Sequence, residues 1–255
     1  MDRSILSQKS VIDASREFIC VRLATYESAE EAEFLKTVYL GRTGELENTV
    51  FTILAPDGKE KLVRGHRSPQ FVFRGNSMAR SMQEIAQRYK AKSTVGEGAL
   101  KLPKLADVRL AMNVAACDSQ MLVVAIGDKK TLPQRRKELA EQAWSKDFIG
   151  HFAYAETSDR KELAKIDGLR PDAAFVVIEP NTYGSEGKAL TQASSVEQLQ
   201  GAMALALSVH EKAMKSHRQH VSSGKADGIH WKTAIPVTDP MSPSNPNRSG
   251  PGPRR

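Results

Sequence analysis

The strongest constraint on the fold is an uninterrupted apolar run at residues 121–127, MLVVAIG. A short run of this kind, rich in Val and Ile, is typical of a central strand that is covered on both faces. A polar break at residues 128–131 follows, and the stretch 132–145 then places apolar side chains near one face of a helix, with Pro133 in its first turn. The pattern therefore predicts a strand followed by a helix, which is the beginning of an α/β unit.

The alternation of strands and helices continues to residue 216. We expect a connecting helix at 103–117, strands at 148–155, 173–179 and 188–191, a short helix at 159–166, and a long helix at 195–216. From the run at 121–127 onward, the predicted order is β-α-β-α-β-β-α. This order favours one sheet with helices packed on it.

The first half of the chain repeats elements of the second half. Residues 16–28 align with 146–158, and residues 48–62 align with 173–190. In the first half an acidic helix is expected at 29–40 and an amphipathic helix at 77–92. The repeat predicts two similar modules. They are an incomplete module at 1–92 and a complete one at 103–216, joined by a linker at 93–102.

The C-terminal residues differ in composition from the rest. The whole chain has a net charge of +7, and residues 216–255 carry a net +4 of it together with six of the twelve prolines. A stretch this poor in apolar residues predicts a flexible, basic, Pro-rich tail over 217–255. Trp231 lies among basic residues there, so a nucleic acid or an acidic surface is one partner class that the 216–255 tail would fit.

The element order of the second module resembles the thioredoxin fold, and together the two modules cover about residues 1–215. The first module resembles thioredoxin-like proteins through the phrase SQKSVIDASREFICVRLAT at residues 7–25. The resemblance implies an α/β fold with two thioredoxin-like modules, each a central mixed sheet flanked by helices. In that family a CxxC pair stands at a helix N-terminus, where the thiolate is stabilised, and a cis-proline lies beside it.

Neither module retains the family's redox positions. In the second module the helix begins near residues 128–131, which hold no cysteine, and the cis-proline position falls near Ala173, with Pro171 two residues early. In the first module the sequence begins inside the first helix at Met1, and the cis-proline position corresponds to Asn48. The resemblance therefore implies a redox-inactive binding or scaffold module. The enzyme alternative is a thiol-disulfide oxidoreductase whose CxxC segment lies upstream of Met1.

Two cysteines, Cys20 and Cys117, are the only redox candidates within the chain. Cys20 is interpreted as a small apolar residue of a strand, and the charge of Asp118 opposes ionisation of Cys117. His210, His217 and His220 recur near one face of the last helix, and we interpret them as structural or exposed rather than as metal ligands. No catalytic, cofactor-binding or metal-binding residue is predicted, and the protein partner is not indicated.

The sequence also bears on location. No apolar run reaches the roughly 18 to 20 residues of a membrane-spanning helix, and the first ten residues, MDRSILSQKS, lack the apolar stretch that a secretory signal carries. The sequence as written therefore predicts a cytoplasmic protein without a membrane segment. Export is expected only if the N-terminus lies upstream of Met1.

Overall fold

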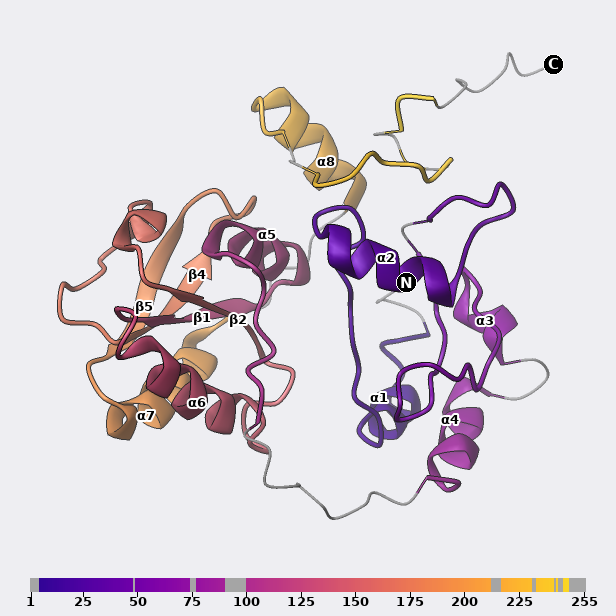
Figure 1. The fold of residues 1–255 in the computed structure, drawn as a ribbon, viewed down its shortest axis with the longest axis horizontal. Helices are drawn as coiled ribbons and strands as arrows, with labels where there is room; N and C mark the ends of the chain where they lie inside the picture. Colours follow the sequence, from indigo (N-terminus) through magenta and orange to yellow (C-terminus); the bar gives the residue numbers. More distant parts are fainter. Residues whose placement is uncertain are drawn as a thin grey trace. The chain divides into compact units, whose positions relative to one another are not determined.

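The chain divides into two compact units in a computed structural model, which describes residues 5–47, 49–73, 77–89, 100–211, 217–230, 233–240, 242 and 245–247. The first unit comprises Met1–Val95 together with Lys232–Arg255, and the sheet unit comprises Gly96–Trp231. The two ends of the chain therefore belong to the same unit (Figure 1).

The sheet unit is built on one mixed, five-stranded sheet with the order β2-β1-β4-β5-β3. Its strands are β1 (Met121–Ile126), β2 (Phe152–Thr157), β3 (Ile166–Asp167), β4 (Phe175–Pro180) and β5 (Gly187–Ala193). β1 runs parallel to β2 and antiparallel to β4, and β4 is antiparallel to β5. The α/β class and the mixed sheet that the sequence predicts are confirmed for this unit.

Helices cover both faces of this sheet. The helices of the unit are α5 (Val108–Asp118), α6 (Leu132–Ala143), α7 (Val196–Val209), α8 (His217–Ala226) and a short 3₁₀ helix, η1 (Arg160–Leu163). α6 and α7 pack on one face, and α5 and η1 pack on the other (Figure 1).

Strand β1 lies between β2 and β4, and all six of its residues are buried. Its side chains alternate between the two layers, since Val123 faces α6 and α7 whereas Leu122 and Val124 face α5. This confirms that the run at 121–127 forms a strand covered on both faces.

The first unit contains the helices α1 (Lys9–Ser15), α2 (Ala29–Val38), α3 (Pro69–Val72) and α4 (Met78–Ala86). Among its described residues no strand is formed, and two isolated bridges join Phe51 to His66 and Leu54 to Lys61. α1 and α4 pack together through Val11, Ala14, Met82 and others of one apolar cluster.

The strand expected around Cys20, at residues 17–23, is absent. Ile19 and Val21 are 77% and 70% exposed in a connection between α1 and α2. The aligned strand of the sheet unit, β2, is held by its pairing with β1. Among the described residues of the first unit no equivalent of β1 is present, so this segment has no strand to pair with. The incomplete module predicted at 1–92 is therefore not confirmed.

Two buried hydroxyls in the sheet unit have no hydrogen-bond partner among the described residues, that of Ser145 and that of Tyr154 on β2, and the tyrosine is the more informative one. Tyr154 is only 3% exposed, and burial raises the pKa of its hydroxyl above the usual 10.0. We expect Tyr154→Phe to stabilise the unit by about 1 kcal/mol, because it removes an unsatisfied polar group.

The same substitution has a consequence for pH dependence. A raised pKa means that the native state holds the tyrosine proton more tightly than the unfolded state does. The free energy of unfolding therefore keeps its full value below pH 10 and decreases as the pH rises above it. Thermal unfolding between pH 8 and 11 should show a steeper alkaline decline for the parent than for the variant. A loss of stability in Tyr154→Phe at neutral pH would contradict the unpartnered hydroxyl.

Candidate functional site

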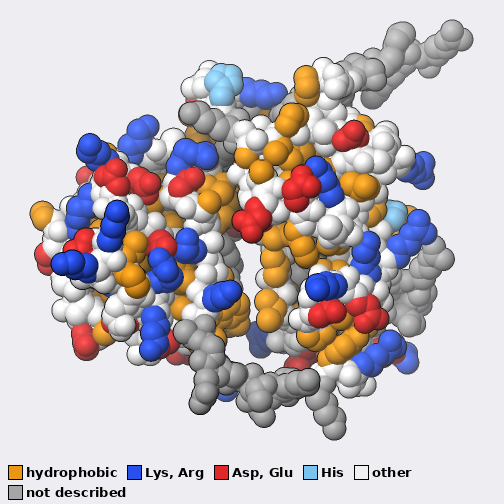
Figure 2. Space-filling model, in the orientation of Figure 1, with side chains coloured by type: hydrophobic (Ala, Val, Ile, Leu, Met, Phe, Trp, Pro, Cys, Tyr) orange, Lys and Arg blue, Asp and Glu red, His pale blue; other side chains and the backbone are white. Residues whose placement is uncertain are grey.

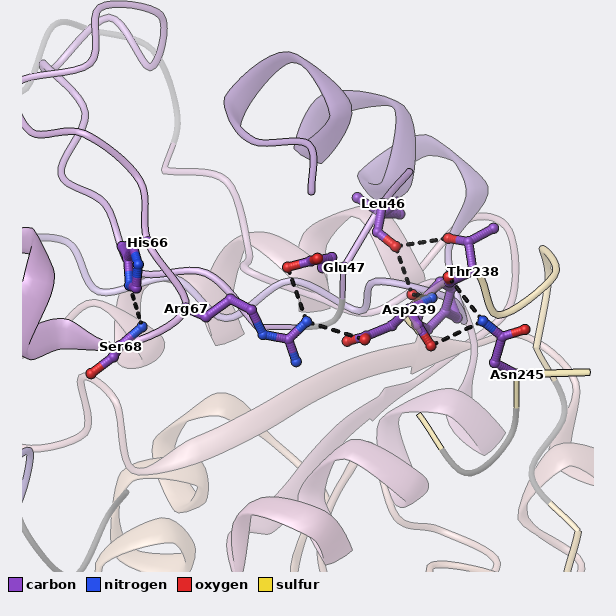
Figure 3. A network of polar contacts seen from close by, with 9 residues as sticks. Leu46, Glu47, His66, Arg67, Ser68, Thr238, Asp239 and Asn245 are labelled. Carbon is purple, nitrogen blue, oxygen red and sulfur yellow. Dashed lines mark hydrogen bonds and ion pairs between the residues drawn. The ribbon is translucent and has the colours of Figure 1, made fainter. Parts of the chain in front are cut away.

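The most extensive polar network in the described part of the first unit surrounds Arg67 (Figure 3). Its Nη1 atom lies 3.1 Å from Asp239 Oδ1 and 2.9 Å from Glu47 Oε2. The side chain of Asp239 is completely buried, that of Glu47 is 11% exposed and that of Arg67 is 32% exposed. One guanidinium thus forms ion pairs with two carboxylates that are far apart in the sequence.

Local structure places Arg67 at this position. The neighbouring His66 exchanges two main-chain hydrogen bonds with Phe51, at 2.9 and 3.1 Å, and its Nδ1 accepts a hydrogen bond from the Ser68 amide at 3.0 Å. The backbone on either side of Arg67 is therefore fixed. Burial lowers the pKa of Arg67, but hydrogen bonds and charges from Asp239 and Glu47 raise it, and the net pKa lies above its ordinary value. The side chain is a permanent cation.

Tyr26 links the network to the chain's C-terminal residues. Its hydroxyl donates to the carbonyl of Leu46 at 3.0 Å and accepts from the amide of Asp239 at 2.9 Å. Thr238 Oγ1 donates to the same Leu46 carbonyl at 2.7 Å. The main-chain carbonyl of Tyr26 accepts from the amides of Ala234 and Ile235, at 2.6 and 3.2 Å.

Apolar contacts accompany these hydrogen bonds. Ile235 and Val237 pack against a cluster that includes Tyr26, Leu35 and Leu46. We call residues 234–239 the C-terminal segment. The segment groove is our name for the surface of the first unit that contacts this segment, formed by Tyr26, Leu46, Arg67 and the apolar cluster.

Asn245 closes the turn after this segment. Its Nδ2 donates to the carbonyls of Thr238 and Asp239 at 3.0 and 3.1 Å. The expected flexible tail therefore includes residues with specific polar and apolar partners. Trp231, the proposed stacking residue of the tail, lies outside the described residues.

The sheet unit has a second candidate site where β1 ends and α6 begins. Asp128 Oδ1 accepts hydrogen bonds from the amides of Lys130 and Thr131, at 2.9 and 2.8 Å, and from the Thr131 hydroxyl at 2.8 Å. The hydrogen bond from the Thr131 amide is the largest cause that lowers the pKa of Asp128. A carboxylate therefore stands at the helix start where the family resemblance implies a thiolate.

A shallow hollow of about 340 Å³ lies beside this helix start, lined by Gly127, Asp128, Thr131, Arg135, Arg160 and others. Arg160 donates to the carbonyls of Arg170 and Ala173, at 3.3 and 3.0 Å, and Arg135 donates to the Ile126 carbonyl. Arg160 thus binds the backbone near the expected cis-proline position at Ala173. The described residues contain no cis peptide bond, and Asn48 lies outside them.

Neither cysteine forms a disulfide in the structure. Cys20 belongs to the first unit, where its Sγ donates to the Ser15 carbonyl at 3.7 Å and partial burial raises its pKa. Cys117 lies on the last turn of α5 in the sheet unit and is exposed. The structure does not bring the two thiols into one disulfide.

The histidines of the predicted last helix do not form one group. α7 ends at Val209, and His210 makes a structural contact there, its ring nitrogens lying 3.3 Å from Glu179 Oε1 and 3.1 Å from the Ser119 carbonyl oxygen. His220 packs its ring on Tyr183 with centroids 4.9 Å apart, and the side chain of His217 lies outside the described residues. Among the residues that the structure describes, no cluster of metal-ligating side chains is present.

The described helices also include none long and apolar enough to span a membrane. On the face of the sheet unit drawn in Figure 2, Lys and Arg side chains are interspersed with Asp and Glu. Comparison of the chain with models of protein families, with curated proteins and with solved structures finds no match.

Proposed function

We propose that this chain is a thioredoxin-like protein without redox catalysis that acts as a binding module. The order β1-α6-β2 followed by β4-β5-α7 supports this, because it produces a central mixed sheet with helices on both faces. Fold alone does not determine activity, so the argument for function depends on the helix start after β1.

The observation that carries the proposal is the chemistry of residues 128–131. A CxxC pair at this spacing would use the α6 amides to stabilise a thiolate and the second thiol to resolve a mixed disulfide. Here Asp128 and Thr131 take the first and fourth positions, and the Asp128 carboxylate accepts a hydrogen bond from the Thr131 amide. Neither side chain can exchange electrons with a disulfide, which leaves binding as the role for this surface.

The direct test is reduction of insulin disulfides by dithiothreitol. We expect the purified chain to give no acceleration over the uncatalysed rate, and the double variant Cys20→Ser with Cys117→Ser to behave in the same way. Turnover comparable to that of an ordinary thioredoxin would overturn the redox-inactive assignment.

A gain-of-function variant tests whether the helix start is built for such chemistry. Asp128 Oδ1 and Thr131 Oγ1 are 2.8 Å apart, so cysteines at both positions would face each other. We expect Asp128→Cys with Thr131→Cys, in the Cys20→Ser, Cys117→Ser background, to form an intramolecular disulfide in a glutathione buffer and to acquire measurable insulin reduction.

Two measurements distinguish success from failure for this variant. Thiol titration should lose two thiols per chain on oxidation, and the single variant Asp128→Cys in the same background should retain its thiol and show no turnover. If circular dichroism shows a folded chain whose two new cysteines stay reduced, the thioredoxin-like reading of this junction is wrong.

A further inference from the structure

We propose that the segment groove is a peptide-binding site and that the C-terminal segment occupies it as an intramolecular ligand. The ligand that fits in trans is an extended peptide with one aliphatic residue on each side of a proline, followed by Thr-Asp. This site gives the proposed binding role a ligand class and rests on that role, but it does not depend on the absence of redox activity.

Recognition of the segment uses three kinds of contact. The Asp239 carboxylate meets Arg67, the Thr238 hydroxyl donates to the Leu46 carbonyl, and Ile235 and Val237 enter the apolar cluster. Charge, hydrogen bonding and shape therefore each select for one part of the ligand. The amides that donate to the Tyr26 carbonyl are main-chain groups, so they fix the direction of a peptide without reading its sequence.

The segment groove also has polar contacts that do not involve the segment. Arg67 Nη1 lies 2.9 Å from Glu47 Oε2, and the Tyr26 hydroxyl donates to the Leu46 carbonyl at 3.0 Å. Two of its principal polar side chains thus have partners outside the segment, which limits the cost of vacating the site. The departing Asp239 carboxylate regains its hydration in water.

The position of the segment in the sequence also favours an exchangeable ligand. The segment follows the whole of the sheet unit, and the contact between Arg67 and Asp239 joins residues 172 positions apart. A tethered ligand competes with a free one in proportion to the fraction of time that it fills the site. Weakening the tethered copy should therefore increase the apparent affinity for a peptide in trans.

The experiment titrates a fluorescently labelled peptide of residues 233–247 into the full-length chain and follows anisotropy. We expect Asp239→Asn in the chain to bind the unmodified peptide at least about tenfold more tightly than the parent chain, because the tethered copy loses its charge while the groove keeps Arg67. A peptide that carries Asn in place of Asp239 should bind this variant at least about tenfold more weakly than the unmodified peptide.

Matched variants locate the binding. Arg67→Gln added to Asp239→Asn should abolish the gain, whereas Arg64→Gln, which removes an exposed arginine from the same unit, should preserve it. Thr238→Val is the second means of weakening the tethered copy, for use if circular dichroism shows that Asp239→Asn does not fold.

Two outcomes would overturn the peptide site. One is the absence of peptide binding by folded Asp239→Asn and Thr238→Val chains, which would make the segment a fixed part of the first unit. The other is equal binding by the parent, Asp239→Asn and Arg67→Gln chains, which would place the peptide elsewhere. The insulin assay and the peptide titration are independent measurements. Insulin reduction would contradict the redox-inactive assignment without affecting the peptide site, and a negative titration would contradict the peptide site alone.

Discussion

Replacing Phe175 by alanine is expected to lower the free energy of unfolding of the sheet unit by about 3 to 5 kcal/mol. Phe175 on β4 is 1% exposed and lies in the apolar layer between the sheet and helices α6 and α7. Its partners on the neighbouring strands are Ala125 and Ala193, both completely buried. Small side chains on either side cannot move into the space that the ring leaves, so a cavity remains.

Urea unfolding followed by circular dichroism measures this loss. Phe175→Leu, which keeps most of the volume, should lose less than half as much. Ile19→Ala, at a position 77% exposed in the first unit, should change stability by no more than about 0.5 kcal/mol. A loss below about 1 kcal/mol for Phe175→Ala would contradict the packing of this layer.

Gly184→Ala is expected to lower stability by about 3 kcal/mol, through backbone strain and a steric clash together. Gly184 lies in the turn between β4 and β5 with φ +67°, a conformation that costs other residues about 1 to 2 kcal/mol. A Cβ at this position would lie 2.5 Å from the Met112 carbonyl oxygen and 2.7 Å from the Asn113 Cα on α5. These are backbone atoms of a packed helix, so the turn itself must move.

Gly168→Ala is the matched control for this prediction. Gly168 has φ +75°, and nothing lies within 4 Å of a Cβ built there. It should show the strain without the clash, and so a loss of about 1 to 2 kcal/mol in thermal unfolding. Equal losses in the two variants would mean that α5 does not approach the β4–β5 turn as closely as described.

The sheet unit could be predicted from sequence because its signals are local. Strand β1 is buried on both faces, so every residue in it is apolar, and α5, α6 and β4 lie within a few residues of their expected bounds. The two-residue strand β3 is too short to leave a pattern. The strand expected at 17–23 has the right residue types, but its formation depends on a neighbouring strand that local composition cannot supply.

Helix α8 was not expected, since its sequence HRQHVSSGKA is polar and contains a glycine. Contacts distant in sequence accompany it. A Cβ at Gly224 would lie 3.0 Å from the ring of Tyr183, that ring also packs on His220, and the Tyr183 hydroxyl donates to Asp227 at 3.3 Å. Tertiary contact thus outweighs low helix propensity here.

The two candidate sites differ in how far sequence could indicate them. The lack of sulfur at residues 128–131 follows directly from the letters at that spacing. The pairing of Arg67 with Asp239 does not, because no local pattern relates two residues so far apart. The one signal in the sequence is Ile-Pro-Val at 235–237, an apolar element in a stretch otherwise poor in residues that could be buried.

The return of residues 232–255 to the first unit has a consequence for biosynthesis. Tyr26, Leu35 and Leu46 leave the ribosome early in translation. Ile235 and Val237, which cover them, emerge only after all of Gly96–Trp231 has been translated. This apolar cluster therefore lacks part of its cover during most of elongation, a period when chaperones would have access to it. A premature stop codon near residue 230 would make that exposure permanent.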